Sequence, residues 1–328
     1  MAKKKTDEQV ARPQRKWGGL LLKIVIMLLV LLAGVLIAFH IMSERAIEEI
    51  VPDRSATNYL DDRVNILVLG TDAEDGVHGR ADSIMVFNVD LVNYRVNVLS
   101  IPRDSRVDIP GYKNKTKINH SFAYGGVDLT RQTVSELLGI PIDYYATTNF
   151  AGFEDIVEAV GGVYIDVPKR MKTHTWYGDI DLEPGYQLLD AEQALGFVRY
   201  RYDAGGDIAR AERQQLFLKA VYNRVVHLDD PTKLPQVITS ILGMVETDLS
   251  YVQLAALVDH FKDIDIDAAF TNETVGGYSQ TIGGASYWII DEDAMADAVQ
   301  RLFYDEPQPL PETGADTSDS ENDEKDDR

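Results

Sequence analysis

An apolar segment near the N-terminus constrains this 328-residue chain more than any other feature. From Trp17 to Met42, the only ionisable side chains are Lys23 near the start and His40 near the end. A helix of about 20 apolar residues crosses a hydrocarbon layer ~30 Å thick. Lys23 lies close enough to one end for its ammonium group to reach the lipid headgroups. We therefore expect one transmembrane helix over residues 17–42.

The charges before this segment predict its orientation. Residues 1–16 carry six lysines and arginines against two acidic residues, and such basic flanks stay on the cytoplasmic side of a membrane. Everything after Ser43 would then lie outside the cell, as in a single-pass type II protein of the cell membrane. The alternative is a cleaved signal peptide, which has a shorter apolar core and a small-x-small cleavage site. No convincing site follows Ala38, which favours the uncleaved anchor.

Composition excludes several classes of protein. The chain has 53 acidic residues against 32 lysines and arginines, a net charge of −21, and no cysteine. Broad nucleic-acid binding needs a basic footprint, so we expect no nucleic-acid partner. The absence of cysteine excludes a disulfide framework, a thiol nucleophile and every cysteine-based metal site. The 45% hydrophobic content is enough for a sizeable core.

We divide the chain into five parts by charge and hydropathy: a cytoplasmic tail over 1–16, the anchor over 17–42, a stalk over 43–60, an external folded domain over 61–304 and an acidic, disordered tail over 305–328.

The folded part alternates expected strands and helices. Strands are expected at 64–70, 83–89, 95–101, 144–148 and 163–167, and helices at 127–138, 151–160, 211–226, 234–245, 251–261 and 294–303. A short helix at 191–195 is expected to pass into an extended stretch over 197–201. This alternation predicts an α/β fold with a mixed central sheet flanked by helices on both faces.

Arginine and aspartate gather where these strands end, while common catalytic motifs are missing. The chain contains no P-loop, dinucleotide-binding or nucleophile-elbow motif, and its six histidines lack metal-ligand spacing. The polar groups at the ends of elements are Asp72, Arg80, Asp82, Arg103, Asp104, Arg199, Arg201, Arg210 and Gln214.

The spacing of these residues favours phosphate chemistry. Arg199 and Arg201 would share one face of an extended strand, and Arg210 and Gln214 would share one face of a helix. Converging guanidinium groups match a diphosphate. Any single pair is better interpreted as an ordinary salt bridge, but their gathering in one domain favours a phosphate site. Carboxylates among the arginines suggest Mg²⁺, which takes one or two carboxylates and substrate phosphates.

Long, ordered motifs then make the chain resemble the LytR–CpsA–Psr family of cell-envelope proteins, most closely over residues 64–224. They are NILVLGTD (65–72), GRADSIM (79–85), VNVLSIPRDSRVDIPG (96–111), KINHSFAYGG (117–126), GGVYIDVP (161–168), LDAEQALGFVRYR (189–201) and GDIARAERQQ (206–215). The resemblance implies a Mg²⁺-dependent phosphotransferase of cell-wall assembly. Such enzymes move a glycopolymer from a polyprenyl (undecaprenyl-type) diphosphate carrier to peptidoglycan, and both wall teichoic acid and capsule are compatible polymers.

The resemblance also implies roles for individual residues. It places Asp72 and Asp82 on Mg²⁺, and it implies an apolar groove for the lipid between the sheet and the helices. The residues implied around the diphosphate are Arg80, Arg103, Arg199, Arg201, Arg210 and Gln214. Arg80, Arg103 and Asp104 are the catalytic candidates, with Asp104 either a general base or a group that orients Arg103.

Two other functions are compatible with this resemblance. A polyprenyl diphosphate pyrophosphatase would need the same site with water as the acceptor. A non-enzymatic regulator or lipid-binding module of the envelope would need the groove alone. The intact arginine and aspartate groups disfavour this last alternative.

Overall fold

The computed structural model describes residues 42–51, 62–72, 79–175, 178–200, 202, 206–228 and 231–304. The expected cytoplasmic tail, all of the anchor except Met42, the acidic tail and Arg201 lie outside these residues. Within them, no helix combines the length and the apolar character that crossing a membrane requires.

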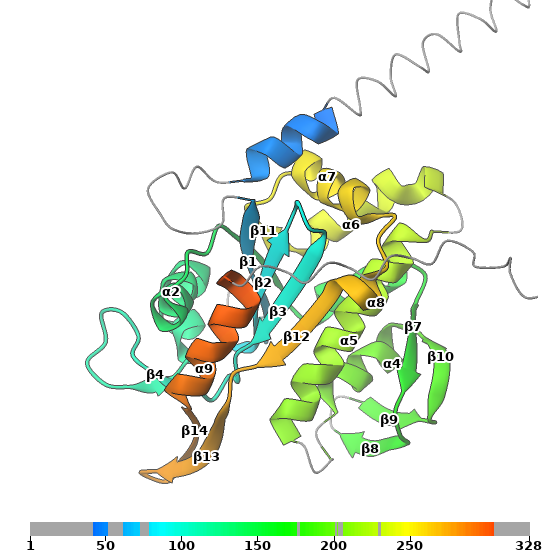
Figure 1. The fold of residues 1–328 in the computed structure, drawn as a ribbon. Helices are drawn as coiled ribbons and strands as arrows, with labels where there is room; N and C mark the ends of the chain where they lie inside the picture. The colour runs from blue at the N-terminus through cyan, green and yellow to red at the C-terminus, as the bar shows by residue number, and fades with distance from the viewer. Residues whose placement is uncertain are drawn as a thin grey trace, which may run out of the picture.

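A six-stranded mixed sheet forms the centre of the domain (Figure 1). In spatial order its strands are β11 (Glu246–Thr247), β6 (Tyr144–Thr148), β1 (Arg63–Thr71), β2 (Ala81–Asp90), β3 (Arg95–Ser100) and β12 (Phe270–Thr274). The pairs β1–β2 and β2–β3 are antiparallel, whereas β1–β6 and β3–β12 are parallel. The expected mixed sheet is confirmed. β1 lies near its middle because its run of apolar residues is suited to burial on both faces.

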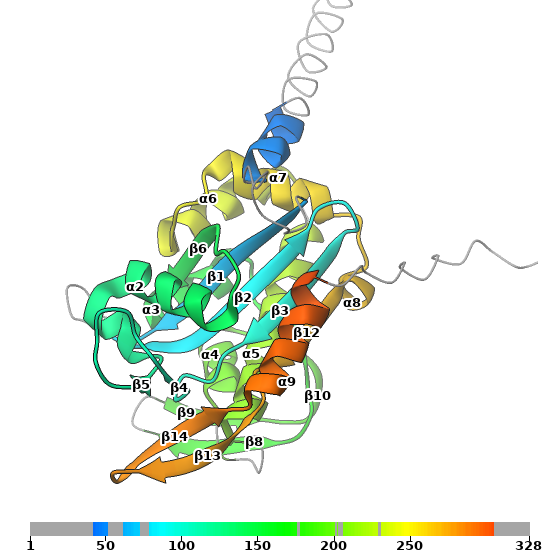
Figure 2. The same ribbon diagram turned by 60° about the vertical axis from the view of Figure 1, so that its left-hand side comes forward.

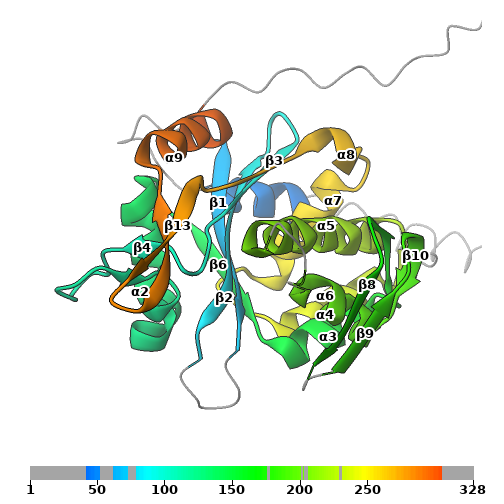
Figure 3. The same ribbon diagram turned by 90° about the horizontal axis from the view of Figure 1, so that it is seen from below.

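Helices cover both faces of this sheet, as Figure 3 shows with the sheet seen along its edge. One face carries α2 (His120–Leu138), α9 (Glu292–Val299) and the short π-helix η2 (Gln300–Tyr304). The other carries α3 (Phe150–Ala159), α4 (Ala191–Arg199), α5 (Gly206–Val226), η1 (Pro231–Lys233), α6 (Leu234–Met244), α7 (Tyr251–Phe261) and α8 (Ile266–Ala269).

Four small ribbons extend the two layers. β4 (Arg106–Val107) pairs with β5 (Thr116–Lys117), and β13 (Gly277–Ile282) pairs with β14 (Ala285–Ile290), at one end of the sheet on the α2 side (Figures 1 and 2). On the opposite side, β7 (Val163–Val167) pairs with β10 (Gly185–Leu189), and β8 (Met171–Thr175) pairs with β9 (Gly178–Leu182). Of these strands, only β7 was expected from the sequence.

The hydrophobic core differs between the two faces. On the α2 side, Leu67, Ile84 and Val86 of the sheet join Val134 and Phe303 in one continuous cluster. On the other side, the apolar residues divide into two clusters. One is centred on the helices α3, α4 and α5 with β7, and the other lies at the far end of the sheet around Ile50, Val64 and Phe261.

One local expectation at the site is wrong: Arg199 lies in the last turn of α4 and not in an extended stretch over 197–201. The alternating letters of VRYR imitate a strand. The helix nevertheless starts at a capping box formed by Asp190 and Gln193. It continues because Ala194, Phe197 and Val198, at helical spacing, bury one face.

Helix α2 starts earlier than expected and contains a break. It begins at His120 instead of residue 127, and Gly125 and Gly126 have non-helical angles inside it. Gly126 has φ 65° and ψ −152°, a conformation that is essentially restricted to glycine. The break therefore separates the first turn, residues 120–124, from the long part of the helix.

The described part of the expected stalk contacts the domain. Residues 42–50 are helical and Ile50 is fully buried. The hydroxyl of Tyr144 donates a hydrogen bond to the Ile50 carbonyl oxygen at 3.1 Å. Oγ of Ser43 donates to a carboxylate oxygen of Asp259 on α7 at 3.5 Å. This segment therefore packs against the sheet and α7 as part of the fold.

Candidate functional site

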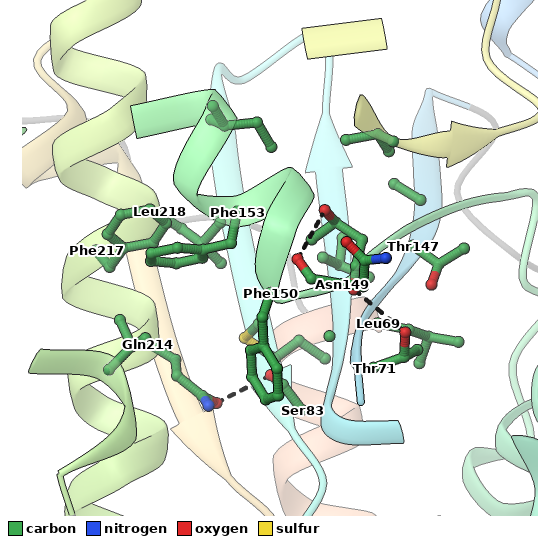
Figure 4. A pocket seen from close by; sticks show the side chains of 18 of the residues that line it. Leu69, Thr71, Ser83, Thr147, Asn149, Phe150, Phe153, Gln214, Phe217 and Leu218 are labelled. Carbon is green, nitrogen blue, oxygen red and sulfur yellow. Dashed lines mark hydrogen bonds between the residues drawn. The ribbon is translucent and has the colours of Figure 1, made fainter. Parts of the chain in front are cut away.

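A cavity of about 490 Å³ lies between the sheet and the helices α3 to α7. On the sheet side it is lined by Val68 of β1, Met85 of β2 and Ala146 of β6. Aromatic and aliphatic side chains of α3 and α5 point into it from the other side (Figure 4). Among them, the rings of Phe153 and Phe217 stack with centroids 4.3 Å apart. Its position is the one that the family resemblance implies for a lipid groove.

One end of this cavity is polar. It lies where β1 ends and β2 begins, and five of the predicted site residues contribute to its wall: Asp82, Arg103, Arg199, Arg210 and Gln214. They come from β2, from the segment after β3, and from helices α4 and α5. Segments far apart in the sequence therefore place three guanidinium groups and a carboxylate at the mouth of an apolar cavity.

A β-bulge brings Asp82 to this mouth. Gly70 pairs with Ser83, but the next residue, Thr71, pairs with Ala81, so Asp82 is the extra residue on β2. A bulge breaks the alternation of side chains between the two faces of a strand. Consequently Asp82 and Ser83 both line the cavity, while Ala81 is buried in the core on the opposite face.

Two arginines converge on Asp82. The guanidinium of Arg103 donates to the Asp82 carboxylate, and the two side chains are 21% and 27% exposed. Nη2 of Arg210 donates to the backbone carbonyl oxygen of Asp82 at 3.3 Å. Arg210 itself is only 5% exposed. A charge-assisted pair of this kind orients the guanidinium groups before any anion arrives.

Helices α3, α4 and α5 complete the polar end. Gln214 lies one turn after Arg210 on α5, and its Oε1 accepts a hydrogen bond from the Ser83 hydroxyl at 2.9 Å (Figure 4). Cζ of Arg199 lies 4.2 Å from the ring centroid of Phe150, the first residue of α3, within the range of a cation–π contact. The prediction that Arg210 and Gln214 share a helix face is confirmed.

Asp72 and Arg80 lie beside the cavity, where the β1–β2 pair ends. The backbone N–H of Asp72 donates to the Arg80 carbonyl oxygen at 3.1 Å, and the Asp72 carboxylate accepts from the Arg80 backbone N–H. Both residues are exposed. Asp72 is therefore held next to the bulge that carries Asp82, without being part of the cavity wall. Arg201 lies outside the described residues.

Asp104 belongs to a neighbouring cluster on the β5 side. Its Oδ1 is 2.9 Å from Nζ of Lys117. Nδ1 of His120, at the start of α2, is 2.8 Å from the Thr116 hydroxyl. Burial and the positive charges of Arg80 and Lys117 lower the pKa of His120, and the Asp104 carboxylate opposes them in part. Asp104 therefore lies in an ion pair beside a partly buried histidine.

Three further side chains of this region were not predicted as site residues. Ser83 follows Asp82 directly, and its position inside the GRADSIM motif was an available signal. Lys117 precedes His120 by three residues in KINH, also inside a noted motif. Phe150 carried no signal, because a phenylalanine after a strand is typical of core packing.

The carboxylates of this region decide whether the magnesium ion implied by the family resemblance could bind here. Among the described residues, no group of three or more histidine, aspartate or glutamate side chains could enclose a metal ion. Asp72 and Asp82 come from the same end of a strand pair, and Asp82 lies beside the arginines. Two carboxylates next to a cluster of arginines would fit Mg²⁺, which retains waters and takes phosphate oxygens as further ligands.

The mixed sheet, the two helical layers and the cavity with an arginine-lined mouth define a three-layer α/β domain built around one apolar cavity. Residues 39–303 match the model of the LytR_cpsA_psr family, and the chain belongs to that family. It is 31% identical over 311 residues to the polyisoprenyl-teichoic acid–peptidoglycan teichoic acid transferase TagU of Oceanobacillus iheyensis, covering 88% of this chain and 94% of that protein.

Solved structures agree with this assignment. Bacillus subtilis TagV superposes with a TM-score of 0.67 at 30% identity, over 74% of this chain and 96% of that one. A structure described as TagT bound to LIIa-WTA superposes with a TM-score of 0.62 at 27% identity, over 77% of this chain and 94% of that one. The expected family and the central mixed sheet are therefore confirmed.

Proposed function

We propose that the chain is a membrane-anchored phosphotransferase that attaches a glycopolymer, carried on a polyprenyl diphosphate, to peptidoglycan. The relative TagU is named as a transferase of teichoic acid from a polyisoprenyl-linked form to peptidoglycan. The motifs that this chain shares with the LytR–CpsA–Psr family imply the same reaction. The expected anchor over residues 17–42 would hold the domain at the membrane that contains such a carrier.

One observation carries this proposal: the cavity is apolar along its length and cationic at one end. A polyprenyl chain is a branched hydrocarbon, and its burial among phenylalanine, leucine and isoleucine side chains is favourable. A diphosphate at the end of that chain would meet Arg103, Arg199 and Arg210. Guanidinium groups bind phosphate oxygens in a bidentate manner.

The arrangement suggests how the reaction proceeds. The acceptor hydroxyl attacks the phosphorus next to the sugar, a new phosphorus–oxygen bond forms, and the bond to the bridging oxygen breaks. Polyprenyl monophosphate leaves with that electron pair, and the hydroxyl proton passes to a base or to water. The arginines stabilise the negative charge on the transferring and leaving phosphates, so catalysis depends on positioning and electrostatics.

Magnesium would be held by Asp82 and Asp72 together with phosphate oxygens of the substrate. When bound, such an ion supplies positive charge to the diphosphate. Two carboxylates alone bind Mg²⁺ weakly, so we expect its affinity to rise when the diphosphate lipid is present. Calorimetry of Asp82→Ala tests this: the coupling should vanish while lipid binding partly persists. Equal Mg²⁺ affinity with and without the lipid would refute the metal site.

The direct test is transfer by the full chain. Purified protein is incubated with lipid-linked glycans and peptidoglycan, and the products are separated into polymer bound to peptidoglycan and polymer released by water. Polymer on peptidoglycan supports the transferase. Release by water alone would make the chain a pyrophosphatase. Native mass spectrometry that finds no polyprenyl phosphate in the extracted protein, together with neither product, would contradict both activities.

A further inference from the structure

Two exposed tyrosines form a stacked pair at the end of the sheet where the candidate site lies. Tyr112, in the loop between β4 and β5, and Tyr124, in the first turn of α2, have ring centroids 4.4 Å apart at an angle of 19°. They remain 47% and 46% exposed. The contact restricts both rings, yet each keeps a large surface open to solvent. The result is an ordered aromatic surface, which we call the tyrosine pair.

The backbone around the tyrosine pair fixes its position. Tyr124 is followed directly by the break in α2, where Gly126 has a positive φ. On its other side, the N–H of Asn119 donates to the Arg103 carbonyl oxygen at 3.2 Å. Tyr124 is five residues beyond Asn119, a distance of roughly 8 Å along a helix axis. The pair is therefore tied to the arginine of the candidate site.

The charge of this surface is opposite to that of the whole chain. Residues 104–120 contain four lysines and arginines against two acidic residues, in a chain with a net charge of −21. The two acidic residues pair with Lys115 and Lys117, which leaves a net positive charge on this segment. Nζ of Lys117 and Cζ of Arg106 lie 5.8 Å and 6.0 Å from the ring centroid of Tyr287 on β14. His120 joins the pair, with its ring 5.8 Å from that of Tyr124. The surface thus combines aromatic faces with positive charge.

These properties match one class of ligand. The C–H groups on one face of a sugar ring carry partial positive charge, and they pack on the negative face of an aromatic ring. Lysine and arginine side chains around the ring would meet carboxylates on the same strand. A glycan strand with acidic peptide stems has both features, whereas a hydrocarbon chain has neither.

We propose that the tyrosine pair is the binding platform for the glycan strand of the acceptor, which stacks on Tyr112 and Tyr124 while its carboxylates meet the surrounding basic residues. This inference rests on the proposed function, because it assigns the acceptor side of that reaction. The cavity lies between the sheet and the helices α3 to α7, and Figure 3 shows these helices on the face of the sheet opposite to α2. Donor and acceptor would therefore approach the Arg103 segment from opposite sides.

The test measures glycan binding separately from transfer. Full-length protein in detergent micelles is titrated with soluble glycan strands of N-acetylglucosamine and N-acetylmuramic acid that carry their stem peptides, and binding is followed by calorimetry. Tyr112→Ala and Tyr124→Ala should each weaken binding by about fivefold to tenfold, as expected for the loss of an aromatic contact. Tyr124→Phe, which keeps the ring, should bind like the original chain. Added salt should weaken binding.

The chain offers a matched control. Tyr186 on β10 is 74% exposed and stacks on Tyr164 with centroids 5.5 Å apart, on a ribbon beyond α5. Tyr186→Ala should leave glycan binding unchanged. Equal weakening by Tyr186→Ala, or unchanged binding in both Tyr112→Ala and Tyr124→Ala, would overturn the proposal. Melting temperatures of all variants show whether a loss comes from unfolding.

The two proposals can fail separately. Capture of the lipid-linked donor should be unchanged in Tyr124→Ala if the pair serves only the acceptor, and weaker donor capture would overturn this assignment. If the original chain binds glycan strands through these tyrosines but transfers no polymer, the platform stands and the transferase proposal falls. If it transfers polymer and the acceptor concentration for half-maximal rate is the same in Tyr124→Ala, the platform falls and the transferase stands.

Discussion

The two faces of the central sheet use the same strands for different purposes. Ile84 and Val86 of β2 pack into one continuous core under α2 and α9. Ser83 and Met85, their neighbours on the same strand, face a cavity of about 490 Å³. Alternation along a strand therefore assigns successive residues to a filled side and a hollow side. We infer that the filled face carries most of the stability and the hollow face carries the chemistry.

The largest expected effect is on the hollow face. Arg103→Ala and Arg199→Ala should each lower the rate of transfer by about 10² to 10³-fold, because each removes charge that stabilises the transition state. The melting temperature should change little, since both side chains are partly exposed. Arg170→Ala is the control, because that arginine is 52% exposed and pairs with Asp181 on the β8–β9 ribbon. Transfer near the original rate in both site variants would make the arginine cluster structural.

A pair of adjacent core variants tests the difference in stability. Ile84 is 2% exposed on the filled face, and Met85 is 4% exposed beside the cavity. Ile84→Ala should cost about 3–4 kcal/mol of unfolding free energy, and Met85→Ala roughly half of that, because Met85 already borders empty space and loses fewer contacts. Thermal unfolding followed by circular dichroism measures both. Equal costs would mean that the two faces are equally well packed.

Filling the cavity should separate binding from stability. Ala146 of β6 borders the cavity beside Val68, its register partner on β1. Ala146→Phe should lower capture of a polyprenyl phosphate by about tenfold, because the new ring occupies apolar space that the lipid needs. The melting temperature should stay the same or rise. Val92→Phe, at a position that is 59% exposed, controls for an added ring. Unchanged lipid capture would show that the lipid binds elsewhere.

The smallest effect concerns pH and the start of α2. The pKa of His120 lies below its ordinary value of 6.5 in the folded chain, chiefly because of burial and then because of Arg80 and Lys117. As the pH falls, His120 therefore takes up a proton in the unfolded chain before it does so in the folded chain. The stability that the neutral His120 contributes to the fold is complete above about pH 6.5 and decreases as the pH drops towards the lowered pKa. His120→Gln should flatten that part of the pH–stability curve; an unchanged slope would contradict it.

Local patterns predicted the sheet better than the ribbons around it. The expected strand at 144–148 and the helix at 251–261 agree with β6 and α7, because the tyrosines and threonines of YYATT favour a strand and Ser250 caps the helix. β8 and β9 were missed because each is short: MKTHT has a single apolar residue, and the alternation of Ile180 and Leu182 in GDIDL covers only four residues. At α4, the capping residues Asp190 and Gln193 were a better guide than the alternation that follows them.

The candidate site was predictable in its residue types but not in its shape. The sequence indicated that Asp82, Arg103 and Arg210 would meet at strand and helix ends, and all three line the cavity. The cavity itself depends on how α3, α5 and α6 are spaced over the sheet, which no local pattern encodes. The same holds for the tyrosine pair, because Tyr112 and Tyr124 meet only through the β4–β5 loop and the break in α2.

The bulge at Asp82 implies a conflict between regularity and activity. If one residue were deleted at this point, β1 and β2 could pair without interruption, and the ladder would lose an irregularity that a strand ordinarily avoids. The same deletion would remove the carboxylate from the cavity or turn it towards the opposite core, where an unpaired charge is costly. Selection for thermal stability alone would therefore favour a β2 strand that is one residue shorter at the bulge, and the resulting proteins would be stable but inactive.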